Sequence, residues 1–289
     1  MYRNMKELLE LANDKQVPLS EIILENEMKI SSFTEEQVFE KLEKRYRVME
    51  NSVEKALEEA LPTVGSLIEG ITKTQNNYAE SDMTICGTFI NKVMARALSG
   101  SEVNASMGKI CAAPTAGACG ILPAVLFSIS EREKLPRRKT LEGLLTASGI
   151  GAIIMKNATV AGAEGGCQSE CGVAASMAAA ATVEMMGGTP EVALNSVAFS
   201  LMNCMGLICD PIAGLVQVPC AQRNASQSIN ALLSADLAMA GMKSLIPPDE
   251  VVEAMYKVGK LLPSQLKETS MGGIAATKTG KEIQKKIFG

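Results

Sequence analysis

Four long segments rich in alanine, leucine and methionine restrict the fold of this chain more than any other feature. They read "LEGLLTASGIGAIIMKNA", "GVAASMAAAATVEMMGG", "PEVALNSVAFSLMNCMGL" and "QSINALLSADLAMAGMKSL". None shows the alternation of β-branched and aromatic residues that strands prefer, and aromatic residues make up only 3% of the chain. Glycine pairs and prolines separate the segments. We therefore predict an all-α fold, a single large helical domain whose helices pack closely through small side chains.

Charge divides the chain into two predicted regions. Residues 1–60 carry 23 charged side chains, whereas residues 141–240 carry nine. In the front region, Thr34 is a predicted N-cap for a long amphipathic helix that ends by Pro62. We expect residues 1–62 to form a charged helical region packed on or beside the core, and residues 63–289 to form the helical catalytic domain.

Composition excludes several classes of partner. The net charge is −4, so the chain lacks the basic footprint of a nucleic-acid-binding protein. The long uncharged run at residues 192–209 contains Asn195 and Asn203 and fits a buried helix better than a membrane span. The first residues, "MYRNMKELLE", are not followed by the apolar region of a signal peptide. These features predict a soluble, cytoplasmic protein.

The chain has eight cysteines and no histidine. In a reducing compartment the cysteines are thiols, either buried in the core or bound to metal. Without histidine, proton transfer has to use another side chain or a histidine supplied by a second chain. The cysteines are Cys86, Cys111, Cys119, Cys167, Cys171, Cys204, Cys209 and Cys220.

Two glycine- and proline-rich loops carry three of these thiols. In "AGAEGGCQSECG" (161–172), Cys167 follows two glycines in a predicted loop before a helix. "CDPIAGLVQVPC" (209–220) cannot be one helix because of its two prolines, and it has a thiol at each end. Cys220 is predicted to open the next helix, whose dipole favours a thiolate.

The spacing of the cysteines leaves more than one interpretation open. No pair fits C-x-x-C, which argues against a zinc ribbon or a thioredoxin-like site. Three thiolates on rigid loops, without histidine, suit an iron–sulfur cluster better than zinc. Buried structural cysteines are the simpler interpretation of the spacing alone.

A third loop precedes a predicted helix in "SMGKICAAPTAGACGILPAVL" (106–126). Pro114, Gly117 and Gly120 leave backbone N–H groups free to bind a carboxylate or phosphate. A plain connector between two helices explains the same residues.

Several motifs in sequence order resemble the α chain of iron–sulfur-dependent L-serine dehydratases. They include "NASMGKICAAPTAGACGILPAVLF", "MKNATVAGAEGGCQSECG", "GLICDPIAGLVQVPCAQRNA" and "LKETSMGGIAATKTGKEIQKKIFG", and the resemblance covers essentially the whole chain. It implies a [4Fe–4S] cluster held by Cys167, Cys209 and Cys220. The other five cysteines are not implied as ligands, although Cys171 lies close enough in sequence to be mistaken for one.

The resemblance also implies an activity and a partner. The expected reaction is the β-elimination of L-serine to pyruvate and ammonia by an oxygen-sensitive lyase, in which the open iron of the cluster acts as a Lewis acid. Family members either fuse an α and a β part or carry them on separate chains, and this chain matches the α part. Single-chain relatives have a histidine in the β part, so we expect a β chain in a heterodimer or a larger hetero-oligomer.

Substrate-binding and proton-transfer residues are predicted less directly. Lys109 and Lys156 stand in apolar stretches and are candidate bases, with surface lysines as the alternative and the β chain as another source of the base. The glycine-containing segment 268–273 is a further candidate for the wall of the site. The candidate residues for binding the substrate carboxylate are Ser106, Thr115, Gly117 and Arg223.

Other functions are compatible with parts of this pattern. A related [4Fe–4S] hydro-lyase could act on another small hydroxy acid, and a non-catalytic iron–sulfur subunit would bind iron without turnover. A helical protein with buried thiols would hold no metal at all. A pyridoxal-phosphate dehydratase is disfavoured because the chain has neither an S-x-K-x-[RN] stretch nor alternating strands and helices.

Overall fold

The computed structural model describes all residues from 1 to 289 and is all-α, which confirms the predicted fold class. Short 3-10 turns and one π-turn join thirteen α-helices, and there is no β-sheet. The helices are α1 (Met5–Lys15), α2 (Leu19–Ser31), α3 (Glu35–Glu58), α4 (Ile71–Ala79), α5 (Gly87–Ala105), α6 (Ile121–Glu133), α7 (Arg137–Asn157), α8 (Gly162–Gly165), α9 (Val173–Met185), α10 (Pro190–Cys204), α11 (Cys220–Met239), α12 (Pro248–Leu261) and α13 (Lys278–Phe288).

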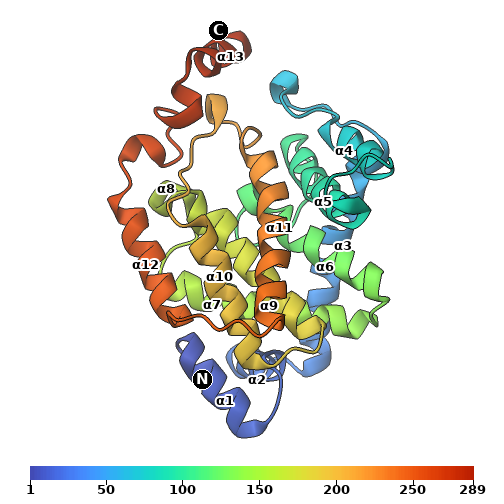
Figure 1. Cartoon of the computed structure of the whole chain (residues 1–289), viewed down its shortest axis with the longest axis vertical. Coiled ribbons are helices and arrows are strands. Elements are labelled where there is room, and N and C mark those ends of the chain that lie inside the picture. The colour runs from blue at the N-terminus through green and yellow to red at the C-terminus, as the bar shows by residue number, and fades with distance from the viewer.

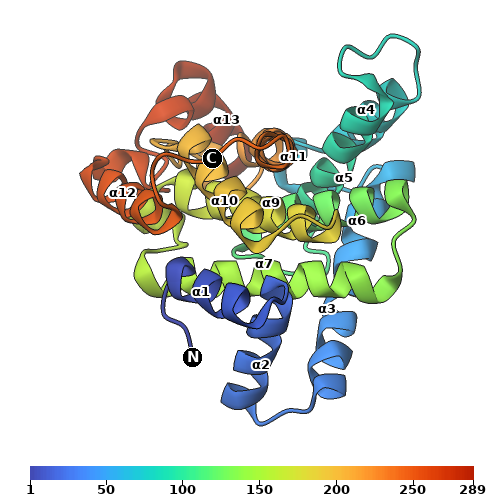
Figure 2. The ribbon, with the colours of Figure 1, turned by 60° about the horizontal axis from the view of Figure 1, so that its bottom comes forward.

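Helix α9 is the centre of the molecule. Every residue from Val173 to Met185 is buried, and α6, α7, α10 and α11 pack around it. In Figure 1, α9 lies behind α10 and α11, and Figure 2 shows the long α7 passing beneath α9 and α10. Alanine and other small side chains let these helices approach one another closely. The alanine-rich segments therefore pack together and form the core.

The charged front region folds as three helices against this core. Thr34 caps α3 with its hydroxyl, and Gln37 completes the capping box, as the sequence predicts. The helix ends at Glu58, and the predicted boundary at residues 62/63 falls in the segment that follows. Helix α3 packs on α5 and α7, and α2 packs on α7. One continuous hydrophobic core therefore includes residues from both sides of that boundary.

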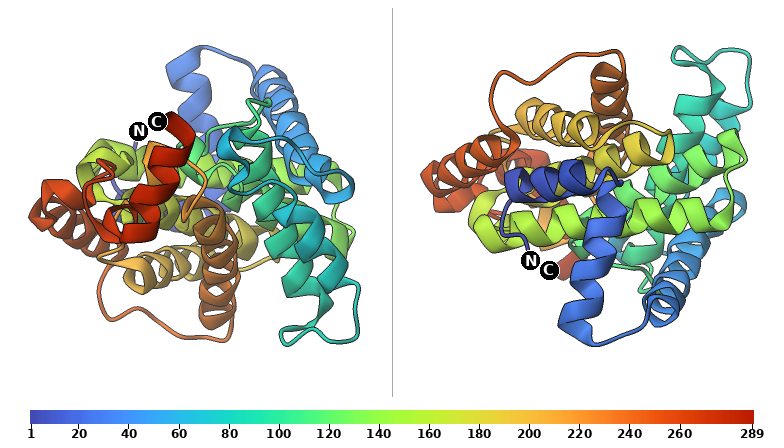
Figure 3. Two further views of the ribbon diagram at one scale, coloured as in Figure 1. Left: turned by 90° about the horizontal axis from the view of Figure 1, so that it is seen from above. Right: turned by 90° about the horizontal axis from the view of Figure 1, so that it is seen from below.

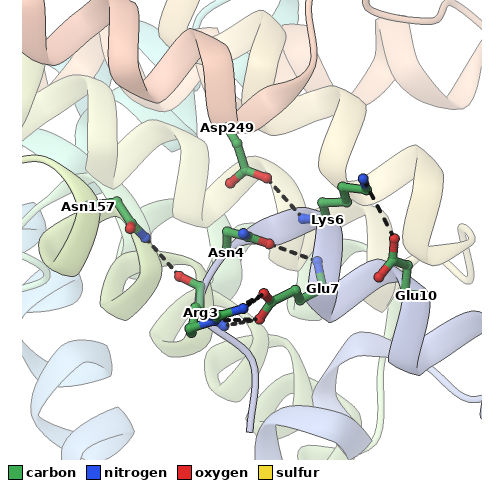
Figure 4. Close-up of polar contacts among 7 residues, drawn as sticks. All are labelled: Arg3, Asn4, Lys6, Glu7, Glu10, Asn157 and Asp249. Carbon is green, nitrogen blue, oxygen red and sulfur yellow. Dashed lines mark hydrogen bonds and ion pairs between the residues drawn. The ribbon is translucent and has the colours of Figure 1, made fainter.

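The first helix is anchored at its N-terminus by residues distant in sequence. The Asp249 carboxylate accepts hydrogen bonds from the backbone N–H groups of Met5 (2.9 Å) and Lys6 (3.0 Å). The Asn157 side-chain amide donates to the Arg3 carbonyl at 2.9 Å. Figure 4 shows the contact of Lys6 with Asp249 and that of Arg3 with Asn157, which join the start of α1 to α12 and α7. The Asn4 side chain caps α1 by accepting from the Glu7 N–H. A carboxylate at the positive end of a helix also stabilises it, so Asp249 acts as a second cap.

The two termini lie at opposite ends of the long axis in Figure 1, with the C-terminus at the top. Helix α13 packs against the 3-10 turns η4 (Ile212–Gly214) and η6 (Gly273–Ala276). Seen from above, in the left panel of Figure 3, α13 lies across that end of the molecule. None of the helices has the length and apolarity needed to cross a membrane.

Candidate metal centre

Three cysteines from separate elements line one buried region near the end of the molecule that α13 covers. Cys167 follows α8, Cys209 lies in the loop after α10, and Cys220 is the first residue of α11, as predicted. Their exposed fractions are 2%, 2% and 7%. The predicted loop at 161–172 is instead mostly helical, with the short α8 followed by the π-turn η3 (Gln168–Gly172) that leads directly into α9. A π-turn widens the backbone locally and often marks a functional site.

The loop between Cys209 and Cys220 is fixed by backbone hydrogen bonds. The Cys209 N–H donates to the Leu266 carbonyl at 2.9 Å, and the Glu268 N–H donates back to the Cys209 carbonyl at 2.8 Å. The Ile212 N–H closes the loop on the Val218 carbonyl at 2.9 Å. The segment after residue 264 therefore holds Cys209 in place and lies beside the cysteine site.

Arg223 and Asp210 form a buried ion pair beside these thiols. Arg223 Nη2 lies 2.8 Å from Asp210 Oδ1, and the Asp210 side chain is 2% exposed. Arg223 Nη1 donates to the Ile208 carbonyl at 2.8 Å and to Cys167 Sγ at 3.3 Å. Asp210 also accepts from the Ile274 N–H at 2.7 Å. Both terminal nitrogens of Arg223 bond to groups within the chain. These contacts therefore do not support the prediction that Arg223 binds a substrate carboxylate through two hydrogen bonds.

Cys167 is the thiol best prepared to lose its proton. Hydrogen bonds from the Cys171 and Cys209 thiols, and then the positive charge of Arg223, lower the pKa of Cys167 to about 3. The same contacts, with burial, raise the pKa values of Cys171 and Cys209 above the ordinary thiol range. A thiol with so low a pKa, in contact with two further thiols and a guanidinium, has the character of a metal ligand.

The N-terminus of α11 does not produce the acidic thiol that the helix dipole predicted for Cys220. Burial, together with the negative charges of Cys167 and Glu170, raises the pKa of Cys220 to about 12. Desolvation therefore outweighs the helix dipole at this position. A metal that binds here has to displace protons from Cys209 and Cys220, which makes binding depend on pH.

The sequence prediction missed Glu170, which lies among these cysteines. Ligand atoms of Cys167, Glu170 and Cys209 all lie within 4.8 Å of one another. Burial raises the pKa of the Glu170 carboxyl to about 7. A carboxylate between two cysteines, in a stretch with few charges, was the signal that could have identified it. Cys220 is outside this tight group but faces the same charges.

Two of the predicted substrate-binding residues lie beside Glu170. The Thr115 hydroxyl is close enough to lower the pKa of Glu170, although it makes no hydrogen bond of standard geometry. At Gly117, a Cβ atom would lie 3.3 Å from Glu170 Oε1. The third, Ser106, donates its hydroxyl to the Val103 carbonyl at 2.9 Å at the end of α5. The structure thus brings the 106–126 segment to the cysteines through Thr115 and Gly117.

The two candidate lysine bases are both exposed. Lys109 lines a surface pocket of about 350 Å³ with Lys41, Lys44 and Arg45. Lys156 lies near the end of α7, on the side of Glu7, whose pKa is lowered mainly by the hydrogen bond from Arg3 and only slightly by the charge of Lys156. Neither lysine has the burial that usually converts a lysine into a base.

The five remaining cysteines occupy varied surroundings. Cys171 contacts Cys167 directly, and the Cys119 thiol donates to the Gly100 carbonyl at 3.4 Å. Cys204 is buried against Gly172, whereas Cys111 is half-buried and Cys86 is exposed. Only Cys171 among these five is placed to join a cluster of thiols around Cys167.

The donor set fits a thiolate-binding metal centre. The three buried sulfurs, one of them with a strongly lowered pKa, are soft ligands of the kind that iron–sulfur clusters use. Arg223, which is mostly buried, donates a hydrogen bond to the Cys167 sulfur. Hydrogen bonds to ligand atoms adjust the metal affinity and redox potential of such centres. Ligand chemistry and burial therefore agree with the expected cluster.

Comparisons with known proteins connect this site to one family. The family model described as "Serine dehydratase alpha chain" matches residues 14–275. The "Probable L-serine dehydratase, alpha chain" of Bacillus subtilis (strain 168) is 45% identical over 289 residues, which are 100% of this chain and 96% of the relative. The "L-serine dehydratase, alpha chain" of Peptoniphilus asaccharolyticus is 50% identical over 285 residues, 99% of this chain and 98% of the relative.

A longer relative matches over only part of its length. The "L-serine dehydratase" of Haemophilus influenzae is 35% identical over 285 residues, which cover 95% of this chain but 61% of that protein.

Proposed function

Because the chain belongs to the serine dehydratase alpha-chain family, as its motifs predict, we propose that it is the cluster-binding subunit of an L-serine ammonia-lyase. Its relatives named L-serine dehydratase support serine dehydration as the reaction. The proposed products are pyruvate and ammonia, and the proposed cofactor is a [4Fe–4S] cluster.

The observation that supports this proposal is the buried group of Cys167, Glu170 and Cys209, whose ligand atoms lie within 4.8 Å of one another, with the buried Cys220 near enough for its pKa to respond to Cys167. These three thiols are the residues we propose to hold the cluster. When bound, a cluster with one iron free of protein sulfur supplies a Lewis acid for the hydroxyl group that leaves serine.

The chain's own residues prepare this site for its ligands. The Arg223 guanidinium stabilises the Cys167 thiolate, and the Asp210 carboxylate orients Arg223. Asp210 also fixes the 268–274 segment through the Ile274 N–H, so the wall of the site and its cysteines are held by one ion pair. Preorganised contacts of this kind keep ligand geometry constant during a reaction.

We propose that a β chain completes the site. The chain has no histidine, and both lysines that the sequence offered as bases are exposed, so we propose that the base that removes the Cα proton comes from the β chain. The longer relative from Haemophilus influenzae matches this chain over only 61% of its own length, which agrees with a site completed by a second part. A heterodimer or larger hetero-oligomer in the cytoplasm follows from this proposal.

Reconstitution tests the assignment of the ligands. We would treat the full chain anaerobically with iron and sulfide, record its visible absorbance and iron content, and assay pyruvate from L-serine with and without the β chain. Separate Cys167→Ala, Cys209→Ala and Cys220→Ala variants should each lose the iron and the colour. Cys86→Ala, an exposed control, should keep both.

The alternatives give different results in the same assay. Loss of the cluster in Cys171→Ala but not in Cys220→Ala would correct the ligand set. A coloured complex of both chains that makes no pyruvate would point to another hydroxy acid or to a non-catalytic role. A chain that binds no iron would contradict the proposed cofactor.

A further inference from the structure

Glu170 is the one buried carboxylate of the chain without a strong hydrogen-bond donor. Four acidic side chains are buried, and the other three are satisfied within the protein. Glu102 accepts three backbone N–H groups, Glu184 accepts from the Ser20 N–H and the Thr146 hydroxyl, and Asp210 accepts from Arg223 and the Ile274 N–H.

The contacts of Glu170 are weak by comparison. Its only hydrogen bond comes from the Cys209 thiol, with Sγ and Oε2 3.9 Å apart, although the residue is only 9% exposed. A buried ionised group without a partner costs several kcal/mol, and native proteins generally supply a partner for it. The missing partner of Glu170 is therefore expected to come from a bound group.

Two glycines border the Glu170 carboxylate. A Cβ atom at Gly162 would lie only 2.5 Å from Glu170 Oε2, so the backbone of α8 closes that side of the carboxylate. Gly117, which is half-exposed, also borders the carboxylate: a Cβ atom there would lie 3.3 Å from Glu170 Oε1, so only a residue without a side chain keeps that position free. The Thr115 hydroxyl is buried there without a hydrogen-bond partner, so two polar groups of the same small region are unsatisfied.

The chemistry of the neighbourhood identifies a cation as the missing partner. Arg223, the basic side chain that contacts Cys167, is committed to Asp210 and Ile208 and makes no hydrogen bond or ion pair with Glu170. A neutral or anionic ligand group would leave Glu170 uncompensated, whereas an ammonium group would neutralise it and donate to both Glu170 and Thr115.

We propose that Glu170, with Thr115, forms the subsite that binds the α-ammonium group of an amino-acid substrate. This inference rests on the proposed function, because it concerns the same site and the same substrate. It gives the site a means of selecting amino acids over hydroxy acids of the same shape. Glu170 is then a substrate-binding residue. Because the ammonium group stays on Cα, Glu170 binds it equally in the substrate complex and in the transition state of the elimination.

The test compares two ligands that differ only in the ammonium group. L-serine is the first, and 3-hydroxypropanoate, in which hydrogen replaces the ammonium group, is the second. In the complex of both chains, Glu170→Gln should raise KM for L-serine about 10- to 100-fold, the loss expected for one charge-assisted hydrogen bond, while kcat changes little. The inhibition constant of 3-hydroxypropanoate should change less than about twofold.

Two further variants make the comparison specific. Glu164→Gln removes an exposed carboxylate from the neighbouring α8 and should leave both ligands unaffected. Thr115→Val should raise KM for L-serine by a smaller factor, about 3- to 10-fold, and should again leave the inhibition constant of 3-hydroxypropanoate unchanged. If Glu170→Gln fails to fold or to take up iron, the Thr115→Val comparison decides the question.

Other outcomes overturn the proposal in distinct ways. If Glu170→Gln weakened the binding of both ligands by the same factor, Glu170 would not recognise the ammonium group. A fall in kcat with KM unchanged would make Glu170 a proton-transfer group instead. A changed electron paramagnetic resonance spectrum of the cluster in Glu170→Gln, without substrate, would make it an iron ligand.

The wild-type complex separates this proposal from the proposed function. If it forms pyruvate from L-serine, the proposed function stands whatever the variants show. If it forms none, the proposed function fails, and calorimetric binding of the two ligands to the wild-type complex decides the subsite. Absence of any preference for L-serine over 3-hydroxypropanoate would then overturn it.

Discussion

Replacing Arg223 with methionine should destabilise the metal-free chain more than any exposed ion-pair change. The substitution keeps a long apolar stem but removes the guanidinium from Asp210, Ile208 and Cys167. Asp210, which is 2% exposed, would keep only the Ile274 N–H as a donor. Removing one partner of a buried pair costs about 3–5 kcal/mol. Because Arg223 is partly exposed, at 16%, we expect the lower end, about 3 kcal/mol.

Urea denaturation followed by circular dichroism measures this cost on the full chain, and thermal unfolding should show a decrease in Tm of about 6 °C or more. The matched control is Lys243→Met, which breaks the exposed Lys243–Glu191 pair (3.2 Å) and should cost less than about 1 kcal/mol. The double variant Arg223→Met/Asp210→Leu should recover part of the loss, because no buried carboxylate is left unpaired. Equal midpoints for Arg223→Met and Lys243→Met would refute the reasoning.

Three further substitutions test how the structure positions the site. Glu102→Gln should lower the free energy of unfolding by about 1.5–3 kcal/mol in urea denaturation, because its amide group would face a backbone N–H that now donates to the carboxylate; an unchanged midpoint would contradict this. Gly120→Ala should cost at least about 1–3 kcal/mol by the same measurement, since its Cβ would lie 2.2 Å from the Ala97 carbonyl oxygen, and a wild-type midpoint would show that α5 and α6 can separate without penalty. Asp249→Ala should cost about 1 kcal/mol and speed amide hydrogen exchange in α1, whereas unchanged exchange would show that this carboxylate does not hold the helix.

Local features of the fold were predictable because they depend on neighbouring residues. The cap at Thr34 and the start of α11 at Cys220 follow from side-chain oxygens and prolines at fixed offsets, and the structure has both. The all-α class followed from the composition of the alanine-rich segments. The loop at 161–172 was misjudged because its glycines suggested irregular backbone, whereas packing against the core keeps most of it helical.

The polar contacts of the site were much less predictable. Arg223 could be singled out from its place near Cys220, but its pairing with Asp210 depends on how the 209–220 loop folds back on itself. Glu170 was missed because its importance comes from Thr115 and Gly117, which belong to a distant segment. Lys109 stood in an apolar stretch of sequence and is nevertheless exposed, since exposure is decided by tertiary packing.

The central claim is that this chain holds a cluster with one iron free to bind substrate. Mössbauer spectroscopy tests it most directly, on the full chain reconstituted with ⁵⁷Fe and sulfide and combined with the β chain, before and after addition of L-serine. The account predicts that about one quarter of the iron signal shifts on adding L-serine, because three of the four irons have cysteine ligands. A spectrum in which all irons stay equivalent, or in which no cluster iron is present, would contradict it.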